Sequence, residues 1–373
     1  MLKVEGLWKT YTVDGGEIPA VRGVSFTVET GEFFTLLGPS GCGKSTTLRC
    51  IAGLEVPNSG EITLGEIDLF SSRQRRSVPI HKRNIGMVFQ SYAIWPHMSV
   101  YDNVDFPVKV KRVPDRREKV MRALELVGLN HLQDRSATDL SGGQQQRVAV
   151  ARAIVMDVDL LLFDEPLSNL DSKLRLQMRF ELRQLQKQLG ITSIYVTHDQ
   201  EEAMVLSDRV AVMDDGNIVE IGKPQDIYLE PRKLFTAKFV GQSNLLPGEV
   251  VSADGATATV RTAIGEIATG AHDRTAPSDG FLMIRPEHIA MSRVKEELLS
   301  SDVNVFEGTI VSETFTGKLV DYRVRVGEFT FEVQTPLHKL HGAHSALQKE
   351  NRVFIHLPPE RCVMLPKDTP GIS

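Results

Sequence analysis

The stretch FFTLLGPSGCGKST, Phe33 to Thr46, joins a short apolar run to a loop rich in glycine. An apolar run of this length that ends in glycine predicts a buried β-strand. The loop fits the pattern G-x-x-x-x-G-K-[ST], in which glycines allow backbone N–H groups to converge on phosphate oxygens. The stretch therefore predicts a phosphate-binding loop at the end of a buried strand.

Individual residues of the loop have distinct expected roles. Lys44 would neutralise the β- and γ-phosphates of a nucleotide, and Ser45 would offer its hydroxyl to Mg²⁺. Cys42 allows two interpretations: a small residue that fits the loop, or a thiol whose pKa the N–H groups lower for a redox role. The residues that we expect to contact the nucleotide here are Gly38, Ser40, Gly41, Cys42, Gly43, Lys44, Ser45 and Thr46.

A second element supplies the acidic groups that nucleotide hydrolysis needs. In LLLFDEP, Leu160 to Pro166, four apolar residues predict a buried strand, and Asp164 follows at its carboxyl end. Open α/β sheets bind their ligands at that end. We expect Asp164 to hold Mg²⁺ through water and Glu165 to act as the general base on an attacking water.

Two more strand ends carry polar residues. His198 ends the apolar run ITSIYVTHD, 191–199, and Gln90 follows the run GMVFQ, 86–90. A lone histidine at a strand end is more often structural. Strands that alternate with helices form parallel sheets, so these strand ends should meet at one edge. We therefore expect His198 to contact the γ-phosphate and Gln90 to reach the metal or the water.

The stretch LSGGQQQRVAVARA, Leu140 to Ala153, resembles a second anion-binding site. Serine and glycines before a helix can present N–H groups to a phosphate. A simple helix cap is the alternative interpretation. Helical spacing predicts that Val148, Ala151 and Val155 face inward. The residues that would face the anion are Ser141, Gly142, Gly143 and Gln144.

Length and composition limit the architecture. A chain of 373 residues with 41% hydrophobic and 24% charged residues predicts a soluble protein of two domains. The net charge of −5 gives no electrostatic argument for a nucleic-acid partner. Three scattered cysteines favour neither a disulfide framework nor a zinc site. We expect an α/β nucleotide-binding domain over 1–240, with an inserted helical subdomain at about 91–155.

The last part of the chain, 241–373, predicts a small all-β, barrel-like domain. In LVDYRVRVGEFTFEVQ, 319–334, apolar residues alternate on both sides of Gly327 and Glu328. That pattern is typical of a hairpin with a two-residue turn. No apolar run approaches the roughly 18 residues of a membrane span, and the first residues lack a signal-peptide pattern. We therefore expect the chain in the cytoplasm.

Together, in this order and spacing, the elements resemble the ATPase subunit of an ABC transporter over essentially the whole chain. In that family two ATPase subunits pack head to tail, and each ATP lies between one subunit's P-loop and the other's signature. The resemblance also implies that Tyr11 stacks on adenine, with Trp8 as the less favoured candidate. It identifies GPSGCGKST as Walker A, Gln90 as the Q-loop, LSGGQ as the signature, LLLFDEP as Walker B, SNLD (Ser168 to Asp171) as the D-loop and His198 as the switch histidine.

The C-terminal part narrows the resemblance. FLMIRPEHIAMS, Phe281 to Ser292, resembles the OB-like, TOBE-type regulatory extension of bacterial importer ATPases. GQSNLLPG, Gly241 to Gly248, replaces the segment typical of sugar importers and looks closer to the polyamine and ferric-iron groups. The resemblance thus implies ATP-driven import of spermidine and putrescine or of ferric iron. Sugar or glycerol-phosphate import and a soluble non-transport ABC ATPase are the alternatives.

The implied cofactors are ATP and Mg²⁺. The implied partners are a second copy of the chain, two transmembrane permease subunits and, indirectly, a periplasmic solute-binding protein, at the cytoplasmic face of the bacterial inner membrane. The apolar residues Tyr92, Ile94, Trp95 and Met98 would form a groove for a helix of a membrane partner. Alternatively they fill the core of the helical subdomain. The β extension either binds a regulatory ligand or protein or strengthens dimer contacts.

Overall fold

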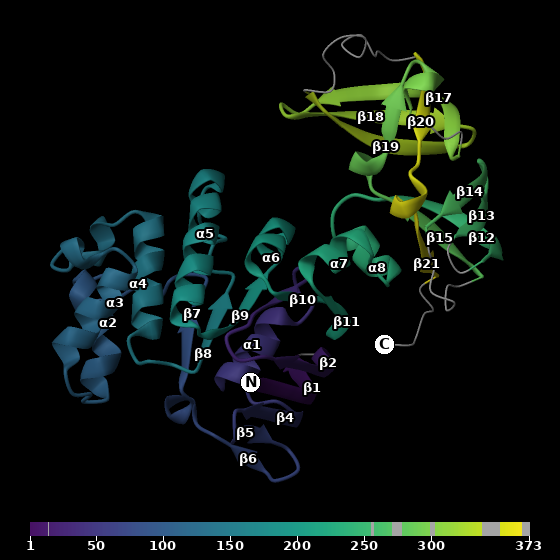
Figure 1. The fold of residues 1–373 in the computed structure, drawn as a ribbon. Helices are drawn as coiled ribbons and strands as arrows, with labels where there is room; N and C mark the ends of the chain where they lie inside the picture. Colours follow the sequence, from purple (N-terminus) through teal and green to yellow (C-terminus); the bar gives the residue numbers. More distant parts are fainter. Residues whose placement is uncertain (14, 255–256, 271–277, 299–302, 338–350, 368–373) are drawn as a thin grey trace. The chain divides into compact units, whose positions relative to one another are not determined.

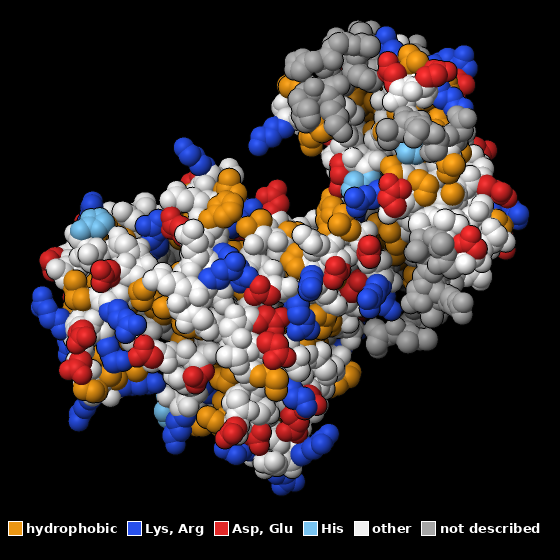
Figure 2. Space-filling view, viewed as in Figure 1, with side chains coloured by type: hydrophobic (Ala, Val, Ile, Leu, Met, Phe, Trp, Pro, Cys, Tyr) orange, Lys and Arg blue, Asp and Glu red, His pale blue; other side chains and the backbone are white. Residues whose placement is uncertain are grey.

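The structure is a computed structural model that describes residues 1–13, 15–254, 257–270, 278–298, 303–337 and 351–367. The chain divides into two compact units, Met1–Pro224 and Gln225–Ser373 (Figure 1). Among the described residues, no helix is both long and apolar enough to cross a membrane. Figure 2 shows acidic and basic side chains interspersed over the visible face of the first unit.

A six-stranded sheet with the order β11-β10-β3-β9-β8-β7 forms the centre of the first unit. Five strands are parallel, and only β11 pairs antiparallel, with β10. The strands with the predicted apolar runs, β3, β8 and β9, are buried along their whole length, as expected for a sheet covered on both faces. The strands are β3 Phe33–Leu37, β7 Ile85–Val88, β8 Leu160–Asp164, β9 Thr192–Thr197, β10 Arg209–Asp214 and β11 Asn217–Gly222.

Successive residues of a strand face opposite sides of the sheet, and two hydrophobic clusters follow from this. Phe34 packs with α1 and the antiparallel sheet β2-β1-β4-β5-β6 on one face. Phe33 packs with α4 and α5 on the other face. The elements are β1 Leu2–Val13, β2 Gly16–Val28, α1 Lys44–Ala52, β4 Ser59–Leu64, β5 Ile67–Ser71, β6 Arg76–Ser77, α4 Gly142–Ile154, α5 Ser172–Leu189 and α6 Gln200–Leu206.

Helices occupy the chain between β7 and β8. Here α2 (Val100–Val110) and α3 (Arg116–Leu126) pack on each other and on α4. Further along, α5 ends at Gly190, whose φ of 63° is the left-handed cap conformation that the sequence predicts. These segments confirm the predicted alternation of strands and helices.

The second unit consists mainly of two five-stranded antiparallel sheets, β14-β13-β12-β15-β21 and β16-β20-β17-β18-β19. Side chains of both sheets, such as Leu246 and Phe331, share one hydrophobic core. Val326 pairs with Phe329 across Gly327 and Glu328, which confirms the predicted two-residue hairpin. The elements are α7 Pro224–Leu229, α8 Leu234–Phe239, β12 Asn244–Ala253, β13 Ala258–Thr262, β14 Gly265–Thr269, β15 Asp279–Ile284, β16 Ala290–Ser292, β17 Val305–Phe315, β18 Leu319–Val326, β19 Phe329–Pro336, β20 Arg352–His356 and β21 Val363–Pro366.

A buried arginine explains why α7 and α8 belong to the second unit. Arg285 is 0% exposed and donates hydrogen bonds to the carbonyl oxygens of Tyr228 (2.7 Å) and Val240 (2.6 Å). Its guanidinium also lies 4.4 Å from the centroid of the Tyr228 ring. Burial lowers the pKa of Arg285. The side chain thus fixes the segment around the two helices to β15.

Arg285→Met should lower the free energy of unfolding of the second unit by about 3 kcal/mol, because it leaves several buried carbonyl oxygens without a donor. Urea unfolding of the full chain, followed by circular dichroism, measures the difference. Arg261→Met is the matched control, since the side chain of Arg261 is 61% exposed and pairs weakly with Glu266 at 3.8 Å. Equal unfolding midpoints for the two variants would contradict the role of Arg285.

Candidate functional site

The loop between β3 and α1 is closed around the Lys44 side chain. Lys44 is 4% exposed, and its ammonium donates to the carbonyl oxygens of Gly38 and Pro39, both at 2.8 Å. Gly43 has a φ of 98°, and a Cβ there would lie 2.2 Å from the carbonyl oxygen of Ala20. A larger residue cannot replace Gly43 without moving the strand beside it.

The two sides of this loop differ in exposure. Ser40 and Gly41 are exposed, and a Cβ added at Gly41 would meet no atom within 4 Å. Cys42 is 4% exposed, and burial raises the pKa of its thiol although the charge of Lys44 lowers it in part. A thiol with a raised pKa does not support the redox interpretation. The structure therefore favours the other interpretation, in which Cys42 is a small residue that fits the loop.

Ser45 and Asp164 lie together where α1 begins and β8 ends. The Ser45 hydroxyl donates to Oδ1 of Asp164 at 2.6 Å, and Asp164 is 5% exposed. Arg49, which the sequence did not single out, lies one helical turn after Ser45 and approaches Oδ2 of Asp164 at 3.4 Å. A hydroxyl and a carboxylate are oxygen ligands that suit Mg²⁺, which otherwise keeps waters and substrate phosphates as ligands. The donor set therefore fits the predicted metal.

Glu165 and His198 face each other across the ends of β8 and β9. His198 Nδ1 lies 3.0 Å from Glu165 Oε2, and the side chains are 53% and 18% exposed. Glu165 has a φ of 47°, a left-handed conformation that costs a non-glycine residue about 1–3 kcal/mol. Its backbone N–H donates to the carbonyl oxygen of Val196 at 3.1 Å, which helps to hold this conformation.

The segment after β7 is tied to two other elements. The carbonyl oxygen of Gln90 accepts a hydrogen bond from Asn169 Nδ2 at 2.9 Å. Tyr92 and Ala93 both have positive φ, at 59° and 46°, and their carbonyl oxygens accept hydrogen bonds from Arg152 of α4. Sequence reasoning missed these contacts because they join residues far apart in the chain.

The LSGGQ segment begins α4 with a capping box. Ser141 Oγ accepts a hydrogen bond from the Gln144 backbone N–H, and the Gln144 side chain accepts one from the Ser141 N–H. A Cβ at Gly143 would lie 3.0 Å from the Leu174 side chain, and one at Gly142 would lie 3.2 Å from Leu170. The glycines therefore let α4 approach α5 and the loop before it.

The inner face of α4 and the N-terminal cap of α5 were also predicted or singled out from the sequence. Val148, Ala151 and Val155 are buried, as their spacing predicts. Asp171, the last residue of SNLD, caps α5 by accepting a hydrogen bond from the Leu174 N–H at 2.9 Å. The capping roles of Ser141 and Asp171 are compatible with a nucleotide nearby. Each side chain satisfies only one of the first N–H groups of its helix, and the other N–H groups of the first turn have no partner within the helix.

Four strand ends bring most of the predicted residues to one edge of the six-stranded sheet. The groups gathered there belong to the Lys44 loop, Asp164, Glu165, His198 and Gln90. The fold separates the LSGGQ segment from these residues, because the Lys44 loop leads into α1 and LSGGQ leads into α4, which pack on opposite faces of the sheet (Figure 1).

The two aromatic candidates for adenine lie on β1. Tyr11 is half-buried, and the Lys9 ammonium lies 5.0 Å from the centroid of its ring. Trp8 is 44% exposed. Their side chains belong to the antiparallel sheet rather than to the six-stranded one.

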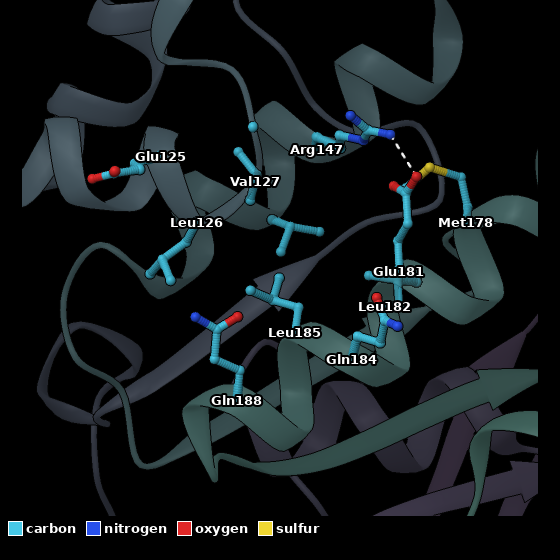
Figure 3. A pocket seen from close by; sticks show the side chains of 12 residues that line it. Glu125, Leu126, Val127, Arg147, Met178, Glu181, Leu182, Gln184, Leu185 and Gln188 are labelled. Atoms are coloured by element: carbon cyan, nitrogen blue, oxygen red, sulfur yellow. Dashed lines mark hydrogen bonds and ion pairs between the residues drawn. The ribbon is translucent and has the colours of Figure 1, made fainter.

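A separate cavity of about 300 Å³ lies between the end of α3, α4 and α5 (Figure 3). Apolar side chains such as Leu126 and Leu185 form much of its wall, and Arg147 pairs with Glu181 at 2.6 Å on one side. None of the predicted nucleotide-binding or catalytic residues is among those that line it. The cavity is a gap between the inserted helices and α5.

Comparison with family models matches both parts of the chain. Residues 21–168 match the family described as ABC transporter, and residues 282–365 match the TOBE domain. The first match contains the Lys44 loop, LSGGQ and LLLFDEP, and the second contains most of the C-terminal sheets.

Similar curated proteins are import ATP-binding proteins. The Fe(3+) ions import ATP-binding protein FbpC 1 of Rhizobium meliloti is 43% identical over 86% of this chain and 88% of its own. The spermidine/putrescine import ATP-binding protein PotA of Mesoplasma florum is 42% identical over 85% of this chain and 86% of its own. The trehalose/maltose import ATP-binding protein MalK of Thermococcus litoralis is 51% identical over 64% of each chain.

Solved structures similar to the chain cover about 60% of it. A dimeric, post-hydrolysis structure of the ATP-binding cassette MJ0796 with ADP and Pi has a TM-score of 0.52 and 31% identity, and covers 60% of this chain and 99% of its own. The structure of cbiO1 from Clostridium perfringens, part of the complex cbiONQ, has a TM-score of 0.55 and 34% identity over 61% of this chain and 90% of its own.

Proposed function

The chain belongs to the ABC transporter family of import ATP-binding proteins and is an ATPase, and we propose that it works as a head-to-tail dimer which hydrolyses two ATP molecules. One observation carries the proposal. The Lys44 loop and the LSGGQ segment begin helices on opposite faces of one sheet. In this proposal each segment forms half of a nucleotide site, and a second chain supplies the other half. The structure of MJ0796 with ADP and Pi is dimeric, which supports a dimer for this chain.

We assign the phosphates of ATP to the loop from Gly38 to Thr46. Its N–H groups and the Lys44 ammonium would replace their present partners with phosphate oxygens. Ser45 and Asp164 would hold Mg²⁺ with the β- and γ-phosphates, and the bound metal would neutralise charge that develops on them. The adenine would stack on Tyr11, and Trp8 is the alternative.

We assign proton abstraction to Glu165. A carboxylate fixed at a strand end can accept the proton of a water that attacks the γ-phosphorus. His198, at 3.0 Å from Glu165, would orient that carboxylate and contact the γ-phosphate. Gln90 would sense the same phosphate or the metal through its side chain.

The other half of each site would come from the partner subunit. Its LSGGQ segment, Ser141 to Gln144, would present a hydroxyl and helix N–H groups to the γ-phosphate. Its Asp171 would approach through the SNLD loop. ATP would thus join the two subunits, and hydrolysis would release them, which gives the cycle of closing and opening that drives transport.

The surface beside Trp95 is our proposed contact for a membrane subunit. The rings of Trp95 and Phe106 pack at a tilt with centroids 4.5 Å apart, and Phe106 is 38% exposed. They line a hollow of about 260 Å³ together with residues from β7 and α4. Tyr92 is buried and Ile94 is half-buried against the hydrophobic core. These two residues therefore fill the core, which was the alternative to a docking groove.

Phe106→Glu should abolish co-purification of membrane subunits while ATP binding by the isolated chain stays unchanged, because it replaces the partly exposed ring that would pack on the partner helix with a hydrated carboxylate. Tagged chain is purified from detergent-solubilised membranes, and its partners are identified by mass spectrometry. Phe315→Glu is the matched control, since Phe315 is 65% exposed in the second unit. Recovery of the same membrane partners with Phe106→Glu would contradict the docking site.

For the solute we propose ferric iron or a polyamine. The relatives that match most of this chain include import proteins for Fe(3+) ions and for spermidine and putrescine. The relative for trehalose and maltose matches over a shorter part of the chain, which favours a sugar less. The chain would act at the cytoplasmic face of the inner membrane, with a periplasmic binding protein selecting the solute.

A further inference from the structure

The SNLD segment, Ser168 to Asp171, makes hydrogen bonds to the elements that carry the catalytic side chains. Ser168 Oγ donates to the carbonyl oxygen of Glu165 at 2.9 Å, and Asn169 Nδ2 donates to that of Gln90 at 2.9 Å. The carbonyl oxygen of Leu170 accepts a hydrogen bond from Arg175 Nη2, also at 2.9 Å. The hydrogen bond between Arg175 and Leu170 connects the SNLD segment with α5.

Arg175 connects the SNLD segment with the start of α6. Its Nη1 donates to Oδ2 of Asp199 at 3.5 Å, and its Nε lies 3.9 Å from Glu202 Oε1. The side chain is 29% exposed, so solvent competes only partly for these contacts. One guanidinium therefore contacts both the Leu170 carbonyl and the residue next to His198.

The chain on both sides of His198 is held firmly. Asp199 accepts hydrogen bonds from the Glu202 N–H and from Arg179 Nη2, at 3.1 and 2.9 Å. Thr197 donates to the Glu202 carboxylate at 2.7 Å, and Glu202 is 3% exposed. Because both neighbours of His198 belong to this network, a shift of Asp199 would move the imidazole as well. The side chain of His198 itself is 53% exposed and contacts Glu165.

We propose that Arg175 is a positioning residue that transmits displacement of the SNLD segment to His198. The inference rests on the proposed function, in which the partner subunit contacts SNLD when both ATP molecules are bound. A guanidinium offers several donors in one plane, so it can hold the Leu170 carbonyl and the Asp199 carboxylate at once. A lysine ammonium keeps the charge but lacks that planar fork.

The test is Arg175→Lys in the full chain, with ATP hydrolysis measured against ATP concentration. We expect kcat to fall about tenfold, as for other residues that carry coupling between sites. The KM for ATP should stay within about twofold, since no contact with the phosphate loop changes. The Hill coefficient should fall towards one, and the melting temperature should stay close to that of the original chain.

Arg183→Lys is the matched control, because Arg183 lies on the same helix and pairs with Asp208 away from SNLD. Its kcat and Hill coefficient should match those of the original chain. Unchanged turnover and cooperativity in Arg175→Lys would overturn the proposal, and so would an equal loss in Arg183→Lys. Absence of ATP hydrolysis by the original chain would instead refute the proposed function, so the two failures are distinguishable.

Discussion

Glu165→Gln should reduce ATP turnover about a thousandfold while ATP binding remains, because the amide keeps the shape of the side chain but cannot accept the proton of the attacking water. Binding should survive because Lys44 and Ser45, the residues expected on the phosphates, are untouched. The closed dimer should then accumulate, since hydrolysis is the step that opens it. Phosphate release measures turnover, and light scattering with ATP measures the mass of the particle.

The control for this variant lies at the same edge of the sheet. Glu201 is 82% exposed on α6 and pairs with Arg179, so Glu201→Gln also removes one carboxylate near His198. Its turnover should remain within about threefold of the original chain, since it loses only a partly exposed ion pair. Full turnover in Glu165→Gln would refute the role of Glu165 as the general base.

Ser141→Arg should abolish hydrolysis by a different route. The long cation would occupy the space in which the signature of one subunit meets the ATP of the other, so the dimer would not close. The isolated subunit should still bind ATP with nearly its original affinity, because Ser141 caps α4 whereas the Lys44 loop precedes α1. Equilibrium binding of a fluorescent ATP analogue and the rate of phosphate release measure the two effects.

Asn130→Arg provides the comparison for Ser141→Arg. Asn130 is an exposed residue of the inserted helical segment, so an added cation there should change neither ATP binding nor turnover. A loss of ATP affinity in Ser141→Arg at concentrations where the chain is monomeric would contradict the account. Such a loss would place the LSGGQ segment in the same site as the Lys44 loop of its own chain.

Much of the first unit could be predicted because its signals are local. An apolar run followed by glycines fixes both the strand Phe33–Leu37 and the loop after it. The same holds for the strand that ends at Asp164 and for the cap at Gly190. Parallel strands then bring their carboxyl ends to one edge, so the meeting of Asp164 with Ser45 follows from topology.

Contacts between distant segments could not be predicted in this way. The hydrogen bond from Asn169 to the Gln90 carbonyl and the bridge made by Arg175 depend on the packing of α5 and on backbone atoms, which carry no sequence signal. The division of the chain into compact units at 224 also depends on such contacts, because Arg285 fixes α7 and α8 to β15. A buried arginine is not distinguishable from an exposed one in a single sequence.

Thiol cross-linking between the two phosphate-binding segments measures whether one ATP lies between two subunits. Cysteines replace Ser40 and Ser141 in the Glu165→Gln chain, and a short bismaleimide is added with or without ATP and Mg²⁺. Chains with only one of the two substitutions are the controls for reaction at Cys42, Cys50 and Cys362, which are buried. We predict an ATP-dependent product of twice the 41.5 kDa chain mass on a denaturing gel. A cross-link within one chain, or a dimer product that forms equally without ATP, would contradict the account.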